Sequence, residues 1–143
     1  MGFRLSVNGM NGKIELDERT IQTVVFQSQS ALDSNARATD FGMSAKITGK
    51  MLFQVGGSGT GGTLDLSKWS QVPSEQADCY REAEISVISA GQVVRKYVFP
   101  NAFVMGYEEH LDDETGVGSF SLHIKQKKDE NRAVRIEGGY GEE

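Results

Sequence analysis

The stretch that decides the fold runs from Val93 to Lys127 and reads VVRKYVFPNAFVMGYEEHLDDETGVGSFSLHIKQK. In its last part Phe120, Leu122 and Ile124 alternate with polar side chains. Residues two apart on a strand share one face, so this period predicts a strand with one face on an apolar core. The preceding turn, Leu111–Gly116, is acidic and ends in the residue that best tolerates positive φ. The stretch therefore predicts a long antiparallel hairpin with an acidic tip.

Other β-patterned segments surround this hairpin. Strands are expected at Phe3–Val7, Lys13–Leu16, Thr20–Ser30, Ser44–Val55, Glu84–Ser89, Val93–Phe99 and Asn131–Glu137. Pro100-Asn101 is expected to break the strand that begins at Val93. Leu66 and Trp69, three residues apart, predict one short helix over Leu64–Val72.

The segment Thr20–Ser30 carries apolar residues on both of its expected faces. A period of two places Ile21, Thr23 and Val25 on one face and Val24 and Phe26 on the other. One face is expected to meet the core, and the other a neighbouring subunit. Gly49, in the middle of the next strand, indicates a bulge or a close backbone approach.

Three segments break the periodic pattern and stay open to two interpretations. The polar loop Asp33–Gly42 is either a binding loop or a surface excursion. Gly56–Gly62 contains G-x-G-x-x-G after a strand, but no alternating strand and helix pattern follows, which favours a connector over a phosphate loop. Pro73–Arg81 fits either a helix or a loop.

Composition narrows the class of protein. A chain of 143 residues fits a single domain, 1–143, and its 17 Gly and 2 Pro suit a β fold with many turns. The net charge of −5 disfavours a general nucleic-acid binder. One cysteine, Cys79, fits a reducing compartment. The sequence offers neither a membrane-spanning apolar run nor a secretory signal, so we expect cytoplasmic assembly without stable membrane anchoring.

No catalytic or metal-binding constellation emerges from the sequence. His110 is the one histidine near Glu108 and Glu109, and these two carboxylates would point to opposite faces of a strand. The charge layout is more informative, because Glu108–Glu114 is acidic and Lys125–Arg135 is net basic. Two such patches can meet head-to-tail between copies, although an ordinary mixed-charge surface would look the same in sequence.

The order of these features resembles the haemolysin-coregulated-protein-like tube subunits of type VI secretion and related contractile injection systems, and the phage tail-tube proteins. Tyr97–Lys127 carries most of the similarity, since it fills the family's pattern with Asn101, Ala102, Val104, Tyr107, Glu108, Gly116, Ser121, Leu122 and Ile124. Gln27–Lys46 looks like the family's long strand, extended polar loop and returning strand. The glycine run Gly56–Gly62 departs from the family pattern.

The resemblance implies a mainly β fold: a small, partly closed antiparallel β-barrel with one short helix. It implies a structural protein without cofactor or enzymatic activity, whose hexameric rings stack into a hollow tube. Its partners would be further copies of itself, sheath and baseplate or spike proteins, and effector cargo in the lumen, with no nucleic acid as specific ligand. After cytoplasmic assembly the tube would be secreted or become part of a virion-like particle.

Ring and stacking contacts are expected at ten polar residues in the loop, the acidic tip and the basic segment: Asp33, Asn35, Arg37, Asp40, Asp112, Asp113, Glu114, Lys125, Lys127 and Arg132. The alternative is a monomeric or dimeric β-barrel adaptor that binds a protein or small ligand at the barrel mouth.

Overall fold

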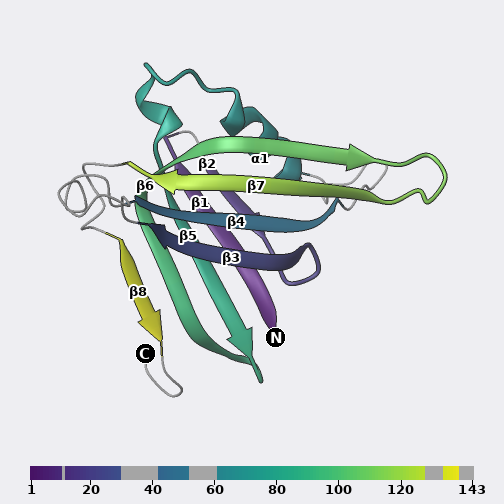
Figure 1. The fold of residues 1–143 in the computed structure, drawn as a ribbon, viewed down its shortest axis with the longest axis horizontal. Helices are drawn as coiled ribbons and strands as arrows, with labels where there is room; N and C mark the ends of the chain where they lie inside the picture. The colour runs from purple at the N-terminus through teal and green to yellow at the C-terminus, as the bar shows by residue number, and fades with distance from the viewer. Residues whose placement is uncertain (11, 30–41, 52–60, 128–133, 139–143) are drawn as a thin grey trace.

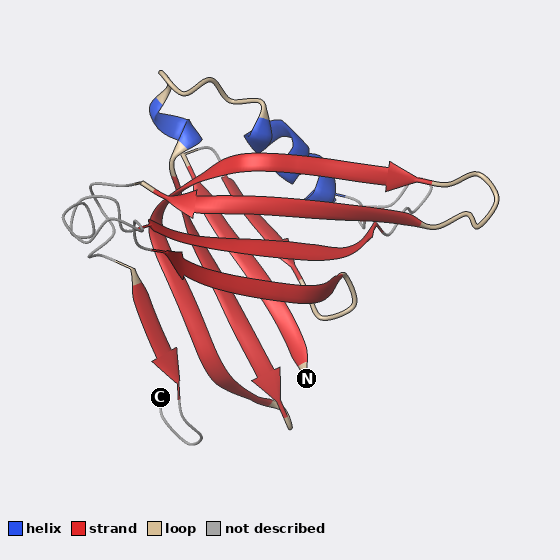
Figure 2. Cartoon of the chain, in the orientation of Figure 1, coloured by secondary structure: helices blue, strands red, loops and turns tan. Residues whose placement is uncertain are grey.

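The computed structural model describes the chain except residues 11, 30–41, 52–60, 128–133 and 139–143. The described part is mainly β with one short α-helix, which confirms the expected fold class (Figures 1 and 2). The strands are β1 (Gly2–Gly9), β2 (Gly12–Leu16), β3 (Ile21–Gln29), β4 (Gly42–Met51), β5 (Arg81–Ser89), β6 (Gln92–Leu111), β7 (Gly118–Gln126) and β8 (Arg135–Gly138). The α-helix is α1 (Gly61–Ser70), and a 3₁₀ turn, η1 (Ala77–Cys79), follows it.

All strands belong to one antiparallel sheet in the order β2-β1-β5-β6-β7-β4-β3, with β8 paired to β6. β6 is shared by two halves of this sheet. We call β2-β1-β5 with the start of β6 the first half, and the end of β6 with β7-β4-β3 the second half. In Figure 1, β3 and β4 pass in front of β1 and β5, so the halves face each other across the core. The sheet stays open between its outermost described strands, as a partly closed barrel does.

The expected strand break at Pro100-Asn101 was wrong, because β6 runs through both residues. Ala83 pairs with Phe99 whereas Arg81 pairs with Ala102, so Pro100 and Asn101 lie in a bulge. A proline is tolerated there because the bulge needs no ladder hydrogen bond from it. At this point β6 leaves its partner β5 and takes up β7, so the bulge is the corner that joins the two halves.

The face assignment within β3 also needs correction. The register shifts between Ile21 and Thr23, so Ile21 is buried on the same side as Val24 and Phe26, whereas Val25 stays 48% exposed. The close backbone approach predicted at Gly49 is confirmed. The Thr20 carbonyl oxygen accepts a hydrogen bond from the Lys50 N–H at 2.7 Å, and a Cβ on Gly49 would overlap that carbonyl.

The core fills the space between the two halves. From the hairpin it takes Phe120, Leu122 and Ile124, all nearly inaccessible to solvent, as the period of two predicted. The helix adds Leu66 and Trp69, and the Trp69 Nε1–H donates to the Cys79 carbonyl oxygen at 2.9 Å. Figure 2 shows α1 and η1 together over one end of the sheet.

The predicted helix is confirmed, but it begins earlier, at Gly61, so the last two glycines of the expected connector belong to it. Gly62 is needed for packing, because a Cβ there would overlap the Leu16 side chain and lie 3.1 Å from the Glu15 carbonyl oxygen. The rest of the glycine run, 56–60, lies outside the described residues. The open segment Pro73–Arg81 forms turns and the short η1.

Candidate assembly surfaces

The β6–β7 hairpin reaches beyond the rest of the sheet and ends in the acidic turn (Figure 1). Asp112 builds this turn: its carbonyl oxygen accepts the Gly116 N–H at 3.0 Å, and its Oδ1 accepts the Glu114 N–H at 2.9 Å. Gly116 has a φ of +68°, a left-handed conformation that favours glycine. The hairpin with an acidic tip and a closing glycine is therefore confirmed.

The charged residues expected at the assembly contacts fall at the two ends of this hairpin. Asp112, Asp113 and Glu114 are exposed at the tip, whereas Lys125 and Lys127 lie at the far end of β7. Seven residue steps separate Gly118 from Lys125, which is about 24 Å along an extended strand. The Lys127 ammonium lies 5.2 Å from the centre of the Tyr80 ring. The other five expected residues lie outside the described part: Asp33, Asn35, Arg37, Asp40 and Arg132.

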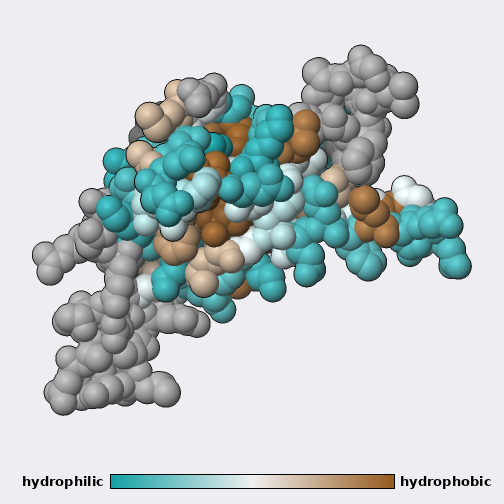
Figure 3. Space-filling model, turned by 90° about the horizontal axis from the view of Figure 1, so that it is seen from above, coloured by the Kyte–Doolittle hydropathy of each residue, from teal (hydrophilic) through white to brown (hydrophobic). Residues whose placement is uncertain are grey.

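Exposed apolar side chains accompany the acidic tip. Leu111 and Val117 flank the turn and are 63% and 56% exposed, and Met105 on β6 is also exposed. From above, the projecting tip is hydrophilic with hydrophobic atoms behind it (Figure 3). A projecting arm with apolar sides can gain free energy by packing against another protein surface.

The second half of the sheet has a free edge on each side within the described residues. β3 ends the strand order, so no described strand pairs with its outer edge. On β6, Ala102 pairs with Arg81 on one side and Gln126 on the other, and β5 begins at Arg81. Beyond Ala102 the described part of the chain supplies only β7 as a partner for β6. Free edges of this kind are the sites at which another chain can extend a sheet.

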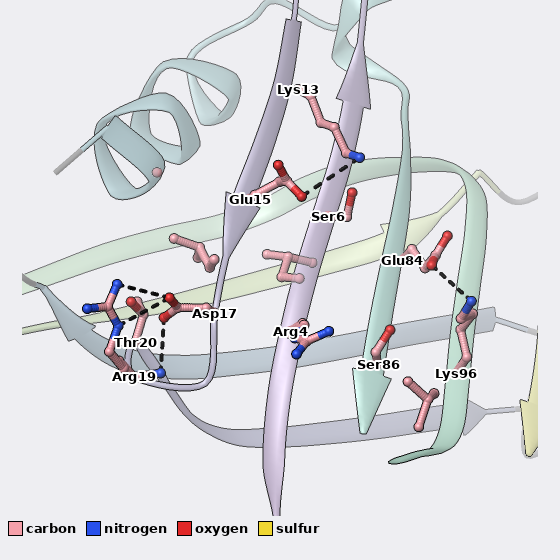
Figure 4. A pocket seen from close by; sticks show the side chains of 14 residues that line it. Arg4, Ser6, Lys13, Glu15, Asp17, Arg19, Thr20, Glu84, Ser86 and Lys96 are labelled. Carbon is pink, nitrogen blue, oxygen red and sulfur yellow. Dashed lines mark hydrogen bonds and ion pairs between the residues drawn. The ribbon is translucent and has the colours of Figure 1, made fainter. Parts of the chain in front are cut away.

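The outer face of the first half forms a polar groove of about 700 Å³ that the sequence did not reveal (Figure 4). Its charged groups pair with one another: Lys13 with Glu15 at 3.8 Å, Arg19 with Asp17 at 3.1 Å and Lys96 with Glu84 at 3.3 Å. Burial alone would raise the pKa of Asp17, but the hydrogen bonds and charge of Arg19 outweigh it, and the pKa lies below its usual value. The groove is thus a surface of paired charges.

A second cluster that the sequence did not reveal fastens η1 to the first half. Asp78 Oδ2 accepts a hydrogen bond from Arg81 at 2.6 Å, and its Oδ1 accepts the Met10 N–H at 3.1 Å. These two hydrogen bonds, that of Arg81 first, lower the pKa of Asp78. The Arg81 guanidinium also lies 5.5 Å from the centre of the Trp69 ring. The cluster therefore joins the β1–β2 turn, the helix and the start of β5, and only the fold brings these residues together.

The sequence expected Glu108 and Glu109 on opposite faces, and the structure places them so. Glu108 is exposed on the outer face of β6, whereas Glu109 accepts a 2.6 Å hydrogen bond from the Tyr107 hydroxyl. Burial first, then this hydrogen bond and the charge of Glu109, raise the pKa of Tyr107. Among the described residues, no group of three or more His, Cys, Asp or Glu could hold a metal ion. None of the described helices is long and apolar enough to cross a membrane.

No protein-family model and no curated protein sequence matches this chain. Several solved structures do match it in fold. Hcp1 from Flavobacterium johnsoniae is 15% identical, with a TM-score of 0.56 over 94% of this chain and 95% of that one. A mutant Hcp1 from the E. coli EAEC 042 pathovar is 9% identical, with a TM-score of 0.58 over 96% and 99% of the two chains.

The 6-fold symmetrised baseplate of the anti-feeding prophage contains a chain that is 12% identical, with a TM-score of 0.56 over 96% of this chain and 93% of that one. These identities are low, and the likeness is one of fold. The resemblance drawn from the Tyr97–Lys127 pattern is confirmed at that level. The chain has the fold of Hcp1 and of the tail-tube proteins of contractile injection systems.

Proposed function

We propose that this chain is the inner-tube subunit of a contractile injection apparatus, and that it assembles into hexameric rings that stack into a hollow tube. The observation that carries the proposal is the second half of the sheet: its outer face is mainly polar, no described strand pairs with either of its edges, and a charged hairpin projects from it. It occurs on the fold of Hcp1 and of a chain in a 6-fold symmetrised baseplate, which supports six copies in the ring.

In this proposal the rings close by edge-to-edge pairing. The free edge of β3 in one copy would pair with Phe103–Leu111 of β6 in the next, so that the second halves form one continuous wall. The interface is heterologous, because the two edges differ, and such an interface closes into a ring when the rotation between copies allows it. Val25 on β3 and Met105 on β6, both exposed, are available for burial at this junction.

Stacking would use the two ends of the hairpin. The acidic tip, Asp112–Glu114, would meet the basic end of β7, Lys125 and Lys127, in the adjacent ring. Their separation along the hairpin supports this arrangement, since opposite charges at opposite ends of a subunit attract head-to-tail. Each contact is weak on its own, but a ring of six copies makes six of them at once.

The proposed partners are further copies of the chain, a sheath, and baseplate or spike proteins. Two solved structures with this fold support the last two classes: a chain of the anti-feeding prophage baseplate and one of the PVC sheath-tube complex. We propose assembly in the cytoplasm and later release with the injected tube, a mechanical role that needs no catalysis or cofactor.

One observation favours the adaptor alternative. At the open mouth between the two halves lies a groove of about 470 Å³ lined by apolar side chains, among them Phe3, Val24, Phe26, Val87 and Tyr97. An adaptor would bind a ligand there as a monomer or dimer, saturably and without rings.

Negative-stain electron microscopy combined with light scattering tests the proposal. Rings or stacked tubes at several times the 15.6 kDa monomer mass support it, and a monomer that saturably binds a ligand in the groove supports the adaptor. Leu111→Gln with Val117→Gln should reduce assembly, because both side chains are exposed beside the tip. Met10→Gln is the control, since Met10 is also more than half exposed and lies on the β1–β2 turn, away from the hairpin.

A further inference from the structure

The outer face of the second half is the one turned toward the viewer in Figure 1. Cross-strand register identifies its members, because Lys46 lies opposite His123, Lys50 opposite Ser119, and Ser44 opposite Lys125. On β3, Val25 lies opposite Lys46 and Thr23 lies opposite Thr48. On β6, Glu108 lies opposite Ser121. Hydroxyl groups and lysines therefore make up most of this face, together with Val25, His123 and Glu108, and its lysines lie on the central strands β4 and β7.

These lysines have no carboxylate partner among the described residues. No ion pair within that part of the chain involves Lys46, Lys50 or Lys125. On the outer face of the first half, by contrast, the basic side chains are paired. Four of them lie within ion-pairing distance of an acidic side chain: Arg4, Lys13, Arg19 and Lys96. Within the described residues, the outer face of the first half therefore pairs its cations, whereas Lys46 and Lys50 on the other face are exposed without an ion-pair partner and Lys125 is half-exposed.

The charge of this face is opposite in sign to that of the whole chain. It carries three lysines against one glutamate, Glu108, whereas the chain as a whole has a net charge of −5. Lys46 and Lys125 are diagonal neighbours across β4 and β7, which places their Cα atoms roughly 7–8 Å apart. Lys50 lies four residues further along β4, about 13 Å from Lys46. The cations thus follow one line along the centre of the sheet.

We propose that this face binds an acidic polypeptide segment. The inference rests on the proposed function for its location, because in a ring closed through the β3 and β6 edges this face would line the channel or cover its exterior, and the lysines would repeat in every copy. Lysines that have no ion-pair partner within the described residues are complementary to a chain of carboxylates, and repetition around a ring multiplies weak contacts.

An acidic peptide fits better than a nucleic acid. Single-stranded nucleic acids are usually held by aromatic side chains on which bases stack. Among the described residues, the outer faces of β3, β4 and β7 carry no aromatic ring other than the His123 imidazole. Phe103, which lies opposite Lys125 on β6, already packs edge-on against Tyr80, with the ring centres 5.9 Å apart. The basic groups are also lysines rather than arginines, so they supply point charges without the planar, bidentate geometry that favours phosphate.

Fluorescence anisotropy of a labelled glutamate-rich peptide, at about 50 mM salt where surface charges are weakly screened, tests the proposal. We expect Lys46→Gln with Lys50→Gln to weaken binding about tenfold, roughly threefold for each exposed charge. Lys46→Arg with Lys50→Arg keeps the charge and should retain binding. Arg4→Gln with Lys96→Gln removes the same charge from the paired face and should change the affinity less than twofold.

The outcomes separate this inference from the tube proposal. Peptide binding that Lys46→Gln with Lys50→Gln weakens about tenfold, while light scattering shows intact rings, supports the proposed binding of an acidic segment. Equal binding by the wild type and the Gln variant overturns it, as does tighter binding of a single-stranded oligonucleotide of equal charge. If the protein binds the peptide as a monomer and never forms rings, the tube proposal fails while the guest-binding face stands.

Discussion

Gly49 provides the sharpest test of how the second half is held together. A Cβ added at this position in β4 would overlap the Thr20 carbonyl oxygen and lie 2.8 Å from Cε1 of Phe120. The Thr20 carbonyl is backbone, and it already accepts the Lys50 N–H at 2.7 Å, so it cannot move without loss of that hydrogen bond. Phe120 is buried in the core and has little room to yield.

The expected cost of Gly49→Ala follows from these contacts. Overpacking a well-filled core costs about 1–3 kcal/mol. Loss of the Lys50 hydrogen bond adds about 0.5–1.5 kcal/mol. We therefore expect the free energy of unfolding to fall by roughly 2–4 kcal/mol, and because β3 is positioned by this contact, we also expect fewer rings.

Urea unfolding followed by the fluorescence of Trp69 measures this loss, since the single tryptophan of the chain is 1% exposed in the folded state. Gly106→Ala is the matched control: it also lies in a strand, but a Cβ there meets no atom within 4 Å. The control should leave stability unchanged or raise it by about 0.4–1 kcal/mol. The reasoning fails if Gly49→Ala costs no more than its control.

Three further predictions concern the charged groups and the thiol. Asp112→Asn with Asp113→Asn and Glu114→Gln should leave the hairpin folded but shorten the tubes seen by electron microscopy, and tubes of unchanged length would remove the acidic tip from the stacking contact. Asp78→Asn should cost about 1–3 kcal/mol at neutral pH, because it removes a charge-assisted hydrogen bond between side chains that are only 19% and 14% exposed. Since the folded-state pKa of Asp78 lies below its usual 3.8, this stabilisation is fully present above about pH 4 and is lost as the pH falls through the folded pKa. Urea titrations at several pH values should therefore show a flatter acid dependence for the variant, and an identical slope would contradict the pairing. Burial, together with the nearby Asp78 charge, raises the pKa of Cys79, so the native thiol should react slowly with Ellman's reagent and rapidly once urea unfolds the chain; fast labelling of the folded protein would contradict its burial.

The two halves of the sheet differ in ways that suit separate roles. The first half pairs its own charges on its outer face and is fastened to η1 by the Asp78–Arg81 cluster. In the second half, no described residue pairs with the outer edge of β3 or forms an ion pair with Lys46 or Lys50, and the tip of the hairpin is exposed. A subunit of a tube needs both: a closed side that keeps its shape and an open side that meets its neighbours.

Local pattern was enough for most of the strands. The period of two in Phe120–Ile124 and the acidic turn closed by Gly116 determined the hairpin, because alternation and positive φ are properties of a few neighbouring residues. The spacing of Leu66 and Trp69 determined the helix for the same reason. The segments that departed from the pattern did so through distant contacts. Pro100 stays in a strand because β6 changes its partner there, and position 62 of the helix is glycine because β2 packs too closely to leave room for a side chain.

The features of the assembly surfaces also fall into two groups, those that the sequence predicts and those that depend on distant contacts in the fold. Composition and residue order were enough to predict a β-rich chain, an acidic tip, a basic segment and a resemblance to tube subunits. The fold was needed to place the charges at opposite ends of one hairpin and to turn the Ile21 side chain inward at a bulge. The fold also places paired cations on one face and Lys46 and Lys50, which have no ion-pair partner within the described part of the chain, on the other. Strand pairing and register bring together residues as far as 86 positions apart, such as Gly2 and Ile88, because no local period encodes which strands become neighbours.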